Sequence, residues 1–365
     1  MRDVYVIGSH TIKFGRYLEN GIKELAAWTI GGVLKDAVIE KKDIQSAWFS
    51  NSGWGMRNFQ HCIRGQVALR PLGIEGIPIT NVENACAGGS TAFHSAWKDV
   101  ASGMTDVSLA IGVEKVYATN KYMMFAGFMS GLDVAGIFDQ IEYIKKTAPE
   151  MLEVPKDAPA PVKKSGTKNK TAGKHGRLQK YWDMFATYVM LGETMGYGNV
   201  KKLLAGLKGT GKGAGADHSP FMDVYAFAAR AHMKKYGSTP RQLAVIASKN
   251  HWHSTMNPNA QYTFAVSVDD VLSDRMVSYP LTRAMCAPIG DGAASAILAS
   301  GDVVKRLGLQ ARAVKIRASV LASGRTRTVD EPDIGERAGR IAYEKSGQGP
   351  TLRWDARVRA APRTY

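Results

Sequence analysis

One stretch constrains this chain more than any other feature, and it reads Asn81-Val-Glu-Asn-Ala-Cys86-Ala-Gly-Gly-Ser-Thr91. The β-branched run over 77–82 that leads into it is typical of a buried strand. The residues after it, over 92–101, place apolar side chains at helical spacing. Cys86 is therefore predicted to lie on a turn that joins a strand to a helix.

Four small residues, Ala87 to Ser90, follow this cysteine, and small residues let a substrate approach the backbone closely. A helix N-terminus also presents free N–H groups and the positive end of the helix dipole, which favour the thiolate form of a cysteine. The turn suits a nucleophilic thiolate. It suits a buried structural cysteine beside a glycine turn equally well, so the stretch alone leaves both interpretations open.

The stretch resembles the nucleophile elbow of the thiolase superfamily, in which the cysteine of an Asn-x-Cys turn is acylated by a CoA thioester. Gly112-Val-Glu114 is similar to the family's Gly-Gly-x-Glu, with one glycine fewer. The segments 249–260 and 280–294 resemble the branch of sterol-carrier and bacterial lipid-transfer-type thiolases. The resemblance extends over residues 3–135 and 220–350.

This resemblance implies an α/β protein with the layered α/β/α/β/α thiolase fold, its second half incomplete. Residues 1–117 are expected to form the N-terminal half and 118–219 a loop domain with a flexible basic segment. Residues 220–350 are expected to open the C-terminal half, with a strand over 314–321 and a helix over 333–346 whose Ile334 and Ile341 face inward. The tail over 351–365 holds four arginines and one aspartate and has no strand pattern. The family's later Gly-His-Pro turn, which carries its activating histidine, is not found in the sequence.

Charge and cysteine content narrow the class of protein. Residues 145–212 hold 14 Lys/Arg and 5 Asp/Glu, which supplies +9 of a net charge of +16. This basic segment matches no nucleic-acid-binding motif, so no nucleic-acid partner is expected. Two interpretations of the segment remain: a surface that attracts the phosphates of CoA, and a loop that is merely solvated. Three cysteines in 365 residues form no disulfide framework, and no apolar run reaches membrane-spanning length. A cytoplasmic protein without a membrane span is expected.

Claisen-type chemistry needs a nucleophile, a base and two oxyanion holes. Cys86 is the predicted catalytic nucleophile, and its own N–H is expected to form half of one hole. His251 is predicted to bind substrate or line the pocket. Together with His253 it is expected to lie in a loop over 250–253. A His-x-His pair without a third ligand is a weak metal motif, so neither a metal nor a cofactor is expected, with CoA as substrate only.

Three other residues have predicted structural roles. His94 is expected to be a packed or solvated helix residue, Cys286 a buried packing residue and Asp291 a residue that fixes a loop. The loop over 51–56 is expected to lie near the site.

Taken together, the resemblance implies an acyl-CoA acyltransferase that works through acyl-Cys86, with thiolysis of a β-ketoacyl-CoA as the leading reaction. Two alternatives stay open: a non-catalytic acyl-CoA or lipid-binding subunit, and a retro-aldol lyase acting on CoA-linked side chains. The resemblance also implies a homodimer, with self-association weakened by the incomplete second half, and a small zinc-ribbon/OB-fold accessory subunit.

Overall fold

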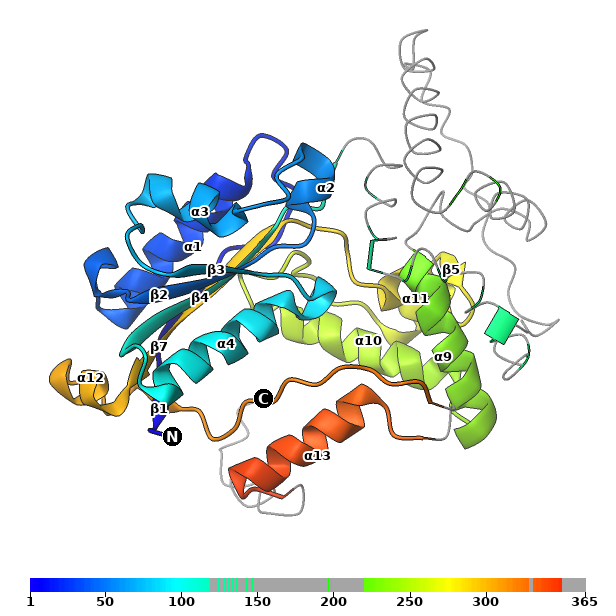
Figure 1. Ribbon diagram of the computed structural model, residues 1–365. Helices are drawn as coiled ribbons and strands as arrows, with labels where there is room; N and C mark the ends of the chain where they lie inside the picture. Colours follow the sequence, from blue (N-terminus) through cyan, green and yellow to red (C-terminus); the bar gives the residue numbers. More distant parts are fainter. Residues whose placement is uncertain are drawn as a thin grey trace, which may run out of the picture.

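A six-stranded mixed sheet forms the centre of the molecule, with its strands in the order β3-β2-β4-β7-β1-β8 (Figure 1). The structure is a computed structural model that describes residues 1–118, 220–327 and 331–349, with scattered residues between 124 and 198. The predicted loop domain over 118–219 and the tail over 351–365 therefore lie almost wholly outside the described residues. The α/β fold expected from the sequence is confirmed.

Within the described residues the strands are β1 (Val4–Thr11), β2 (Ser46–Ser50), β3 (Ile79–Val82), β4 (Val107–Glu114), β5 (Met276–Ser278), β6 (Leu281–Thr282), β7 (Gly292–Ser300) and β8 (Val314–Lys315). The helices are α1 (Ile22–Ala37), α2 (Trp54–Asn58), α3 (Arg64–Leu69), α4 (Gly88–Ser102), α9 (Pro220–Tyr236), α10 (Pro240–Ser254), α11 (Val268–Ser273), α12 (Gly301–Arg306) and α13 (Ile334–Ser346).

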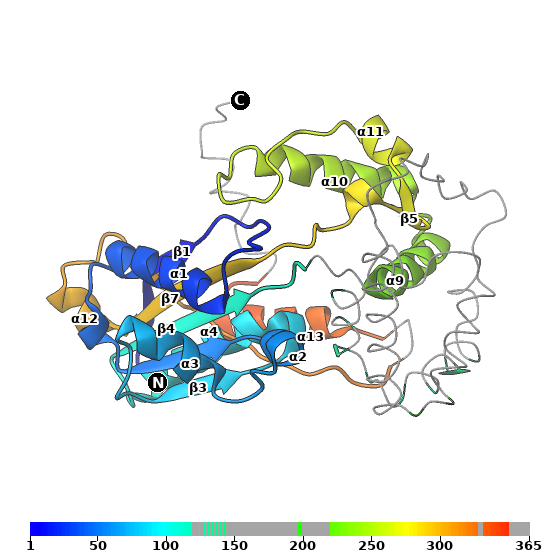
Figure 2. The same ribbon diagram turned by 90° about the horizontal axis from the view of Figure 1, so that it is seen from above.

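Helices cover both faces of this sheet because its strands alternate apolar side chains between the faces. On one face, Leu109 and Ile297 pack in a buried cluster with Leu25 of α1. On the other face, Ala110 and Leu298 pack with helix α4. Helices α10 and α11 lie beside the sheet and bury a small cluster of their own (Figure 2).

The parallel strands β2, β3 and β4 direct their carboxyl ends to one edge of the sheet. The loop that follows Ser50, the turn that follows Val82 and the side chain of Glu114 therefore meet at this edge. In open α/β sheets, ligands bind outside the carboxyl ends of the strands. The edge that carries Cys86 is thus where such a fold places its chemistry.

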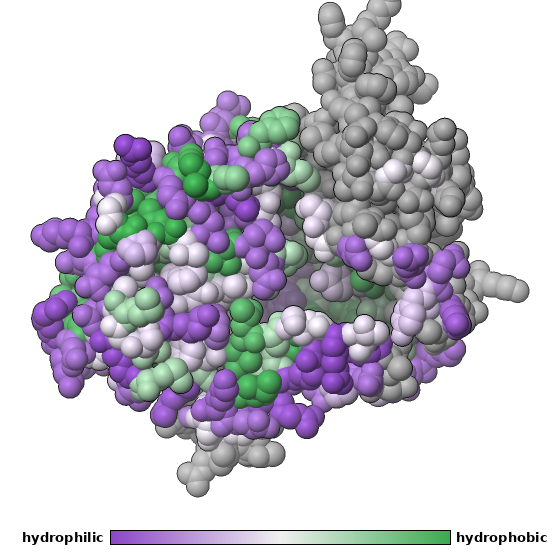
Figure 3. Space-filling view, in the orientation of Figure 1, coloured by the Kyte–Doolittle hydropathy of each residue, from purple (hydrophilic) through white to green (hydrophobic). Residues whose placement is uncertain are grey.

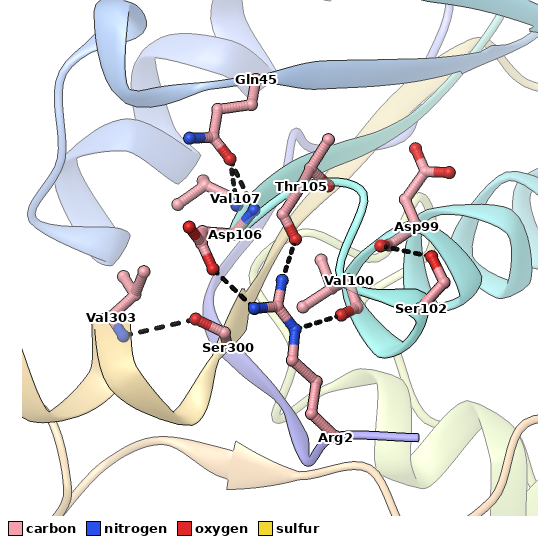
Figure 4. Close-up of polar contacts among 10 residues, drawn as sticks. All are labelled: Arg2, Gln45, Asp99, Val100, Ser102, Thr105, Asp106, Val107, Ser300 and Val303. Atoms are coloured by element: carbon pink, nitrogen blue, oxygen red, sulfur yellow. Dashed lines mark hydrogen bonds and ion pairs between the residues drawn. The ribbon is translucent and has the colours of Figure 1, made fainter.

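At the opposite edge, Arg2 ties the start of the chain to the far end of α4 (Figure 4). Its guanidinium donates to Val100 O at 2.6 Å and Asp106 Oδ1 at 2.8 Å, and also to Thr105 O. Gln45 Oε1 accepts from the backbone N–H groups of Asp106 and, at 3.2 Å, Val107. These contacts fix the α4–β4 connection, so α4 is held at the end remote from Cys86.

The later part of the chain contributes a strand to the same sheet as the earlier part. Strand β7, expected in the C-terminal half, lies between β4 and β1 and pairs antiparallel with both. The predicted boundary at residue 220 therefore does not separate two sheets. The division into domains stays a prediction, because most of the loop domain lies outside the described residues.

Two further predictions in this part are wrong. The strand expected over 314–321 is limited to Val314–Lys315, because only these two residues pair with β1. Helix α13 forms where predicted, yet none of its residues is buried: Ile334 and Ile341, expected to face inward, are 44% and 38% exposed. The extended segment before it runs along α4.

Asp291, immediately before β7, holds three segments together. Its side chain is fully buried (0% exposed), and it accepts hydrogen bonds from the N–H groups of Tyr17 at 2.9 Å and of Val116 and Tyr117 at 2.7 Å. Lys115 Nζ lies 3.6 Å from the same carboxylate. The prediction that Asp291 fixes a loop is confirmed, and the loops it fixes follow β1 and β4.

Replacing Asp291 with asparagine is expected to lower the free energy of unfolding by about 2–4 kcal/mol, because hydrogen bonds to a charged acceptor are lost and an NH₂ group meets N–H donors. Urea denaturation measures the change. Asp3→Asn is the matched control, since Asp3 makes only an exposed ion pair with Lys315, and it should cost below about 1 kcal/mol. Equal effects of the two substitutions would contradict this role of Asp291.

Candidate functional site

Cys86 lies in a single turn of 3₁₀ helix, Ala85–Ala87, between strand β3 and helix α4. Its thiol is free and exposed. The predicted strand-to-helix turn is confirmed, and the alternative of a buried structural cysteine is wrong. Because α4 begins two residues later, at Gly88, the positive end of its dipole lies beside the thiol.

Gly88 lets the start of α4 approach the sheet, whereas Gly89 and Gly112 leave room for a Cβ. A Cβ on Gly88 would lie 2.3 Å from Ser50 Oγ, closer than any real contact. A Cβ on Gly112 of β4 would lie 3.6 Å from the Cα of Gly89. A Cβ on Gly89 itself would meet no atom within 4 Å, so only Gly88 is required for packing.

Side chains on both sides of the turn bond to its backbone. Glu83 Oε1 accepts from the N–H of Ala85 at 2.6 Å and from Ser52 Oγ at 2.9 Å. Beyond the cysteine, Asn84 Nδ2 donates to Thr91 Oγ1, and Thr91 Oγ1 donates to Ala87 O, both at 2.9 Å. The turn that carries Cys86 is thus bonded from the loop after β2, from β3 and from α4.

Glu114 supports this arrangement from the end of β4. Its carboxylate accepts from the backbone N–H of Ser52 and, at 3.2 Å, of Gly53. Burial raises the pKa of the Glu114 carboxyl, and these N–H groups together with Arg57 and Arg64 act in the opposite direction. The family-like motif Gly112–Glu114 therefore anchors residues 51–53, which lie beside the Cys86 turn as predicted for the loop over 51–56. Residues 54–56 of that predicted loop belong to helix α2 instead.

His251 lies on the last turn of α10, and so does His253, so the predicted loop over 250–253 is wrong. The capping box at Thr239 starts this helix, and it continues through Ser254. The ring of His251 stacks with Tyr262 at an interplanar angle of 10° and lies 5.4 Å from Phe264. Its contacts do not involve the Cys86 turn, so a role in substrate binding stays a prediction.

The other two residues with predicted structural roles, His94 and Cys286, make packing contacts and hydrogen bonds. His94 Nδ1 lies 2.8 Å from Ser319 Oγ and its ring is 5.5 Å from Trp97, while burial, then Lys98 and Lys345, lower its pKa. It is a packed helix residue. Cys286 is half-buried and its Sγ donates to Thr282 O at 3.3 Å; burial raises its pKa to about 11, which disfavours a thiolate.

Neither a metal cluster nor a membrane-spanning helix is found in the part of the chain that the structure describes. Figure 3 shows, on one face, apolar side chains in small separate patches among polar ones.

Sequence reasoning missed Ser52, Glu83 and the positive φ of Ala85. The signal for Glu83 was its position two residues before Ala85, where a carboxylate can accept from a nearby backbone N–H. The contact from Ser52 depends on how β2 and β3 pair, and no local pattern reports that pairing.

The structure thus combines an α/β fold with an exposed cysteine between a strand and a helix N-terminus, as the sequence predicts. The N-terminal domain of thiolases matches residues 4–186, and the chain belongs to the thiolase family. At the level of the family this means acyl-CoA acyltransferases, in agreement with the resemblance seen in the sequence.

Individual relatives support this assignment. The benzoylsuccinyl-CoA thiolase subunit BbsB of Thauera aromatica is 29% identical over 96% of this chain and 69% of its own length. Sterol carrier protein 2 of Gallus gallus is 31% identical over 96% of this chain but only 52% of its own. The chain thus spans about half the length of sterol carrier protein 2.

A solved structure, an Ltp2-ChsH2(DUF35) aldolase, matches 95% of this chain and 70% of its own with a TM-score of 0.54. At 15% identity this likeness shows the fold alone.

Gly88→Ala is expected to destabilise the folded protein by about 1–3 kcal/mol, because its Cβ would collide with Ser50 Oγ. Gly89→Ala is the matched control and should change stability by less than about 0.5 kcal/mol, since its Cβ meets open space. Thermal unfolding of both variants provides the comparison.

Adding Ser50→Ala to Gly88→Ala removes the colliding oxygen and leaves Ser50 Cβ at 3.6 Å, so the double variant should recover most of the loss. A Gly88→Ala variant as stable as the Gly89→Ala variant would show that this close approach is not needed.

Proposed function

We propose that this chain is a thiolase-type acyltransferase that forms an acyl-Cys86 thioester from an acyl-CoA, with thiolysis of a β-ketoacyl-CoA as its reaction. The observation that carries the proposal is the exposed thiol of Cys86 at the start of α4, on a turn with glycines on its helix side. Membership of the thiolase family supports CoA thioesters as the substrate class.

In this proposal the Cys86 thiolate attacks the β-keto carbon of the substrate. The bond between the α- and β-carbons breaks, its electron pair goes to the α-carbon, and protonation there releases a shorter acyl-CoA. The thiol of a second CoA then attacks acyl-Cys86, transfers the acyl group to its sulfur and returns the cysteine. The N–H of Cys86 and the α4 dipole stabilise the charge on the carbonyl oxygen during each attack.

Intact-mass spectrometry after mixing with a set of acyl-CoAs tests the nucleophile. We expect one added acyl mass, absent in Cys86→Ser. Cys62→Ser is the matched control, because Cys62 is also an exposed free cysteine and its loss should leave the adduct unchanged.

Cys286 is not expected to form the adduct, since its raised pKa leaves it protonated at neutral pH. An adduct that persists in Cys86→Ser would refute the proposal. CoA binding without any adduct would favour the alternative of an acyl-CoA-binding subunit.

The compartment and partners follow from the same resemblance. Three free cysteines agree with the reducing cytoplasm. A small accessory subunit of the zinc-ribbon/OB-fold class is part of the proposal, and the ChsH2(DUF35) component of the solved aldolase loosely fits it.

A homodimer is also proposed, through β3 at the edge of the sheet, where Thr80 and Asn81 are exposed. Self-association is expected to be weakened by the incomplete second half, so sedimentation velocity at low micromolar concentration should give mainly single chains, with two-chain species forming as the concentration rises. A tight dimer at low micromolar concentration would contradict this weakened self-association.

A further inference from the structure

The residue before the nucleophile has an unfavourable backbone conformation. Ala85 has φ +43°, in the left-handed region that residues with a Cβ avoid. Such conformations persist only where the surroundings hold them, and they are concentrated at functional sites. Because Ala85 directly precedes Cys86, its dihedral angles determine where the Cα–Cβ bond of Cys86 points.

Two polar side chains from different segments hold Ala85 on both sides. Glu83 Oε1 accepts from the N–H of Ala85 at 2.6 Å. Ser52 Oγ lies 2.9 Å from Glu83 Oε1 and 3.3 Å from Ala85 O, so these two acceptors share its single hydroxyl proton. We call Ser52 and Glu83 the Ala85 clamp.

The clamp is itself anchored to the sheet. The backbone N–H of Ser52 donates to Glu114 Oε1 at the end of β4, and Glu114 is partly buried. Glu83 follows directly after Val82, the last residue of β3. The position of Ala85 is therefore fixed by contacts with β3 and β4 of the central sheet, and not by its own turn alone.

We propose that Ser52 and Glu83 are positioning residues that hold Ala85 in the left-handed conformation and thereby aim the Cys86 thiol at the substrate carbonyl. The inference rests on the proposed acylation of Cys86, but the conformation of the turn can be measured separately. Neither side chain touches the reacting atoms in this proposal; both act through the backbone of Ala85.

The first test measures the rate of Cys86 acylation at saturating acyl-CoA in Ser52→Ala and Glu83→Ala. Each should slow acylation about tenfold with little change in the acyl-CoA concentration at half-maximal rate, because the aim of the thiol changes and substrate binding does not. Glu83→Gln should fall between Glu83→Ala and the natural protein, since a neutral amide oxygen accepts hydrogen bonds more weakly.

Ser102→Ala and Glu75→Ala are matched controls. Ser102 bonds only within the far end of α4, to Asp99 O, and Glu75 pairs with Arg70 on the surface. Both controls should acylate at the natural rate. Clamp variants that acylate at the rate of these controls would overturn the proposal.

A double-mutant cycle with Ala85→Gly separates positioning from a general structural effect. Glycine adopts the left-handed conformation without a steric penalty, so it needs the clamp less. The loss caused by Glu83→Ala should therefore shrink from about tenfold to about twofold when measured in the Ala85→Gly background. An equal loss in both backgrounds would contradict a role through the conformation of Ala85.

Amide hydrogen exchange over 84–88 gives a readout that does not need activity. Exchange at the Ala85 amide should speed up at least about fivefold in Glu83→Ala and stay unchanged in Glu75→Ala. Unchanged exchange in Glu83→Ala refutes the clamp, whatever the acylation rates. If exchange speeds up in Glu83→Ala but the natural protein forms no acyl-Cys86, the proposed function and the aiming of the thiol are refuted. The clamp is then a structural feature only.

Discussion

Antiparallel pairing of β7 with both β4 and β1 is the interaction on which the rest of the structure depends. Without it the two strands would have no common neighbour, and the sheet would be divided between β4 and β1. The alternating side chains of β7 enter the apolar clusters on both faces of the sheet, with Ile297 toward α1 and Leu298 toward α4. The same pairing places Asp291 at the edge where the loops after β1 and β4 meet it.

The site depends on this sheet through short polar links. Glu114 at the end of β4 binds the loop after β2, Ser52 of that loop reaches the turn after β3, and the turn presents Cys86. Each link consists of a few hydrogen bonds, and together they connect three parallel strands to one thiol. Gly88 adds a steric condition, because the helix that starts at this turn must pass close to Ser50.

Local patterns predicted the elements that have strong local signals. The β-branched run before Cys86 and the helical spacing after it located β3, the turn and α4, and the apolar stripe of α1 was equally clear. The loop-fixing role of Asp291 was predicted, although its three N–H donors come from two segments far away in sequence.

What the sequence did not reveal depends on contacts between distant segments. The neighbours of β7 are set by tertiary pairing and not by its composition. His251 was expected in a loop because its polar neighbours conceal the end of α10, and residues 316–321 alternate like a strand but lack a partner strand to pair with. The left-handed Ala85 is held by side chains on either side of it, so no propensity of alanine predicts it.

The position of β7 has a consequence for synthesis of the chain on the ribosome. Strands β1 and β4 are complete once residue 114 has emerged, but the strand that joins them ends at Ser300. Until then β4 has one unpaired edge, and β1 has neither of its neighbours, because β8 is made later still; such apolar edges are prone to pair with other chains. Folding of the central sheet is therefore a late event, and the growing polypeptide needs protection, from a chaperone or from its own helices α1 and α4, until that strand arrives.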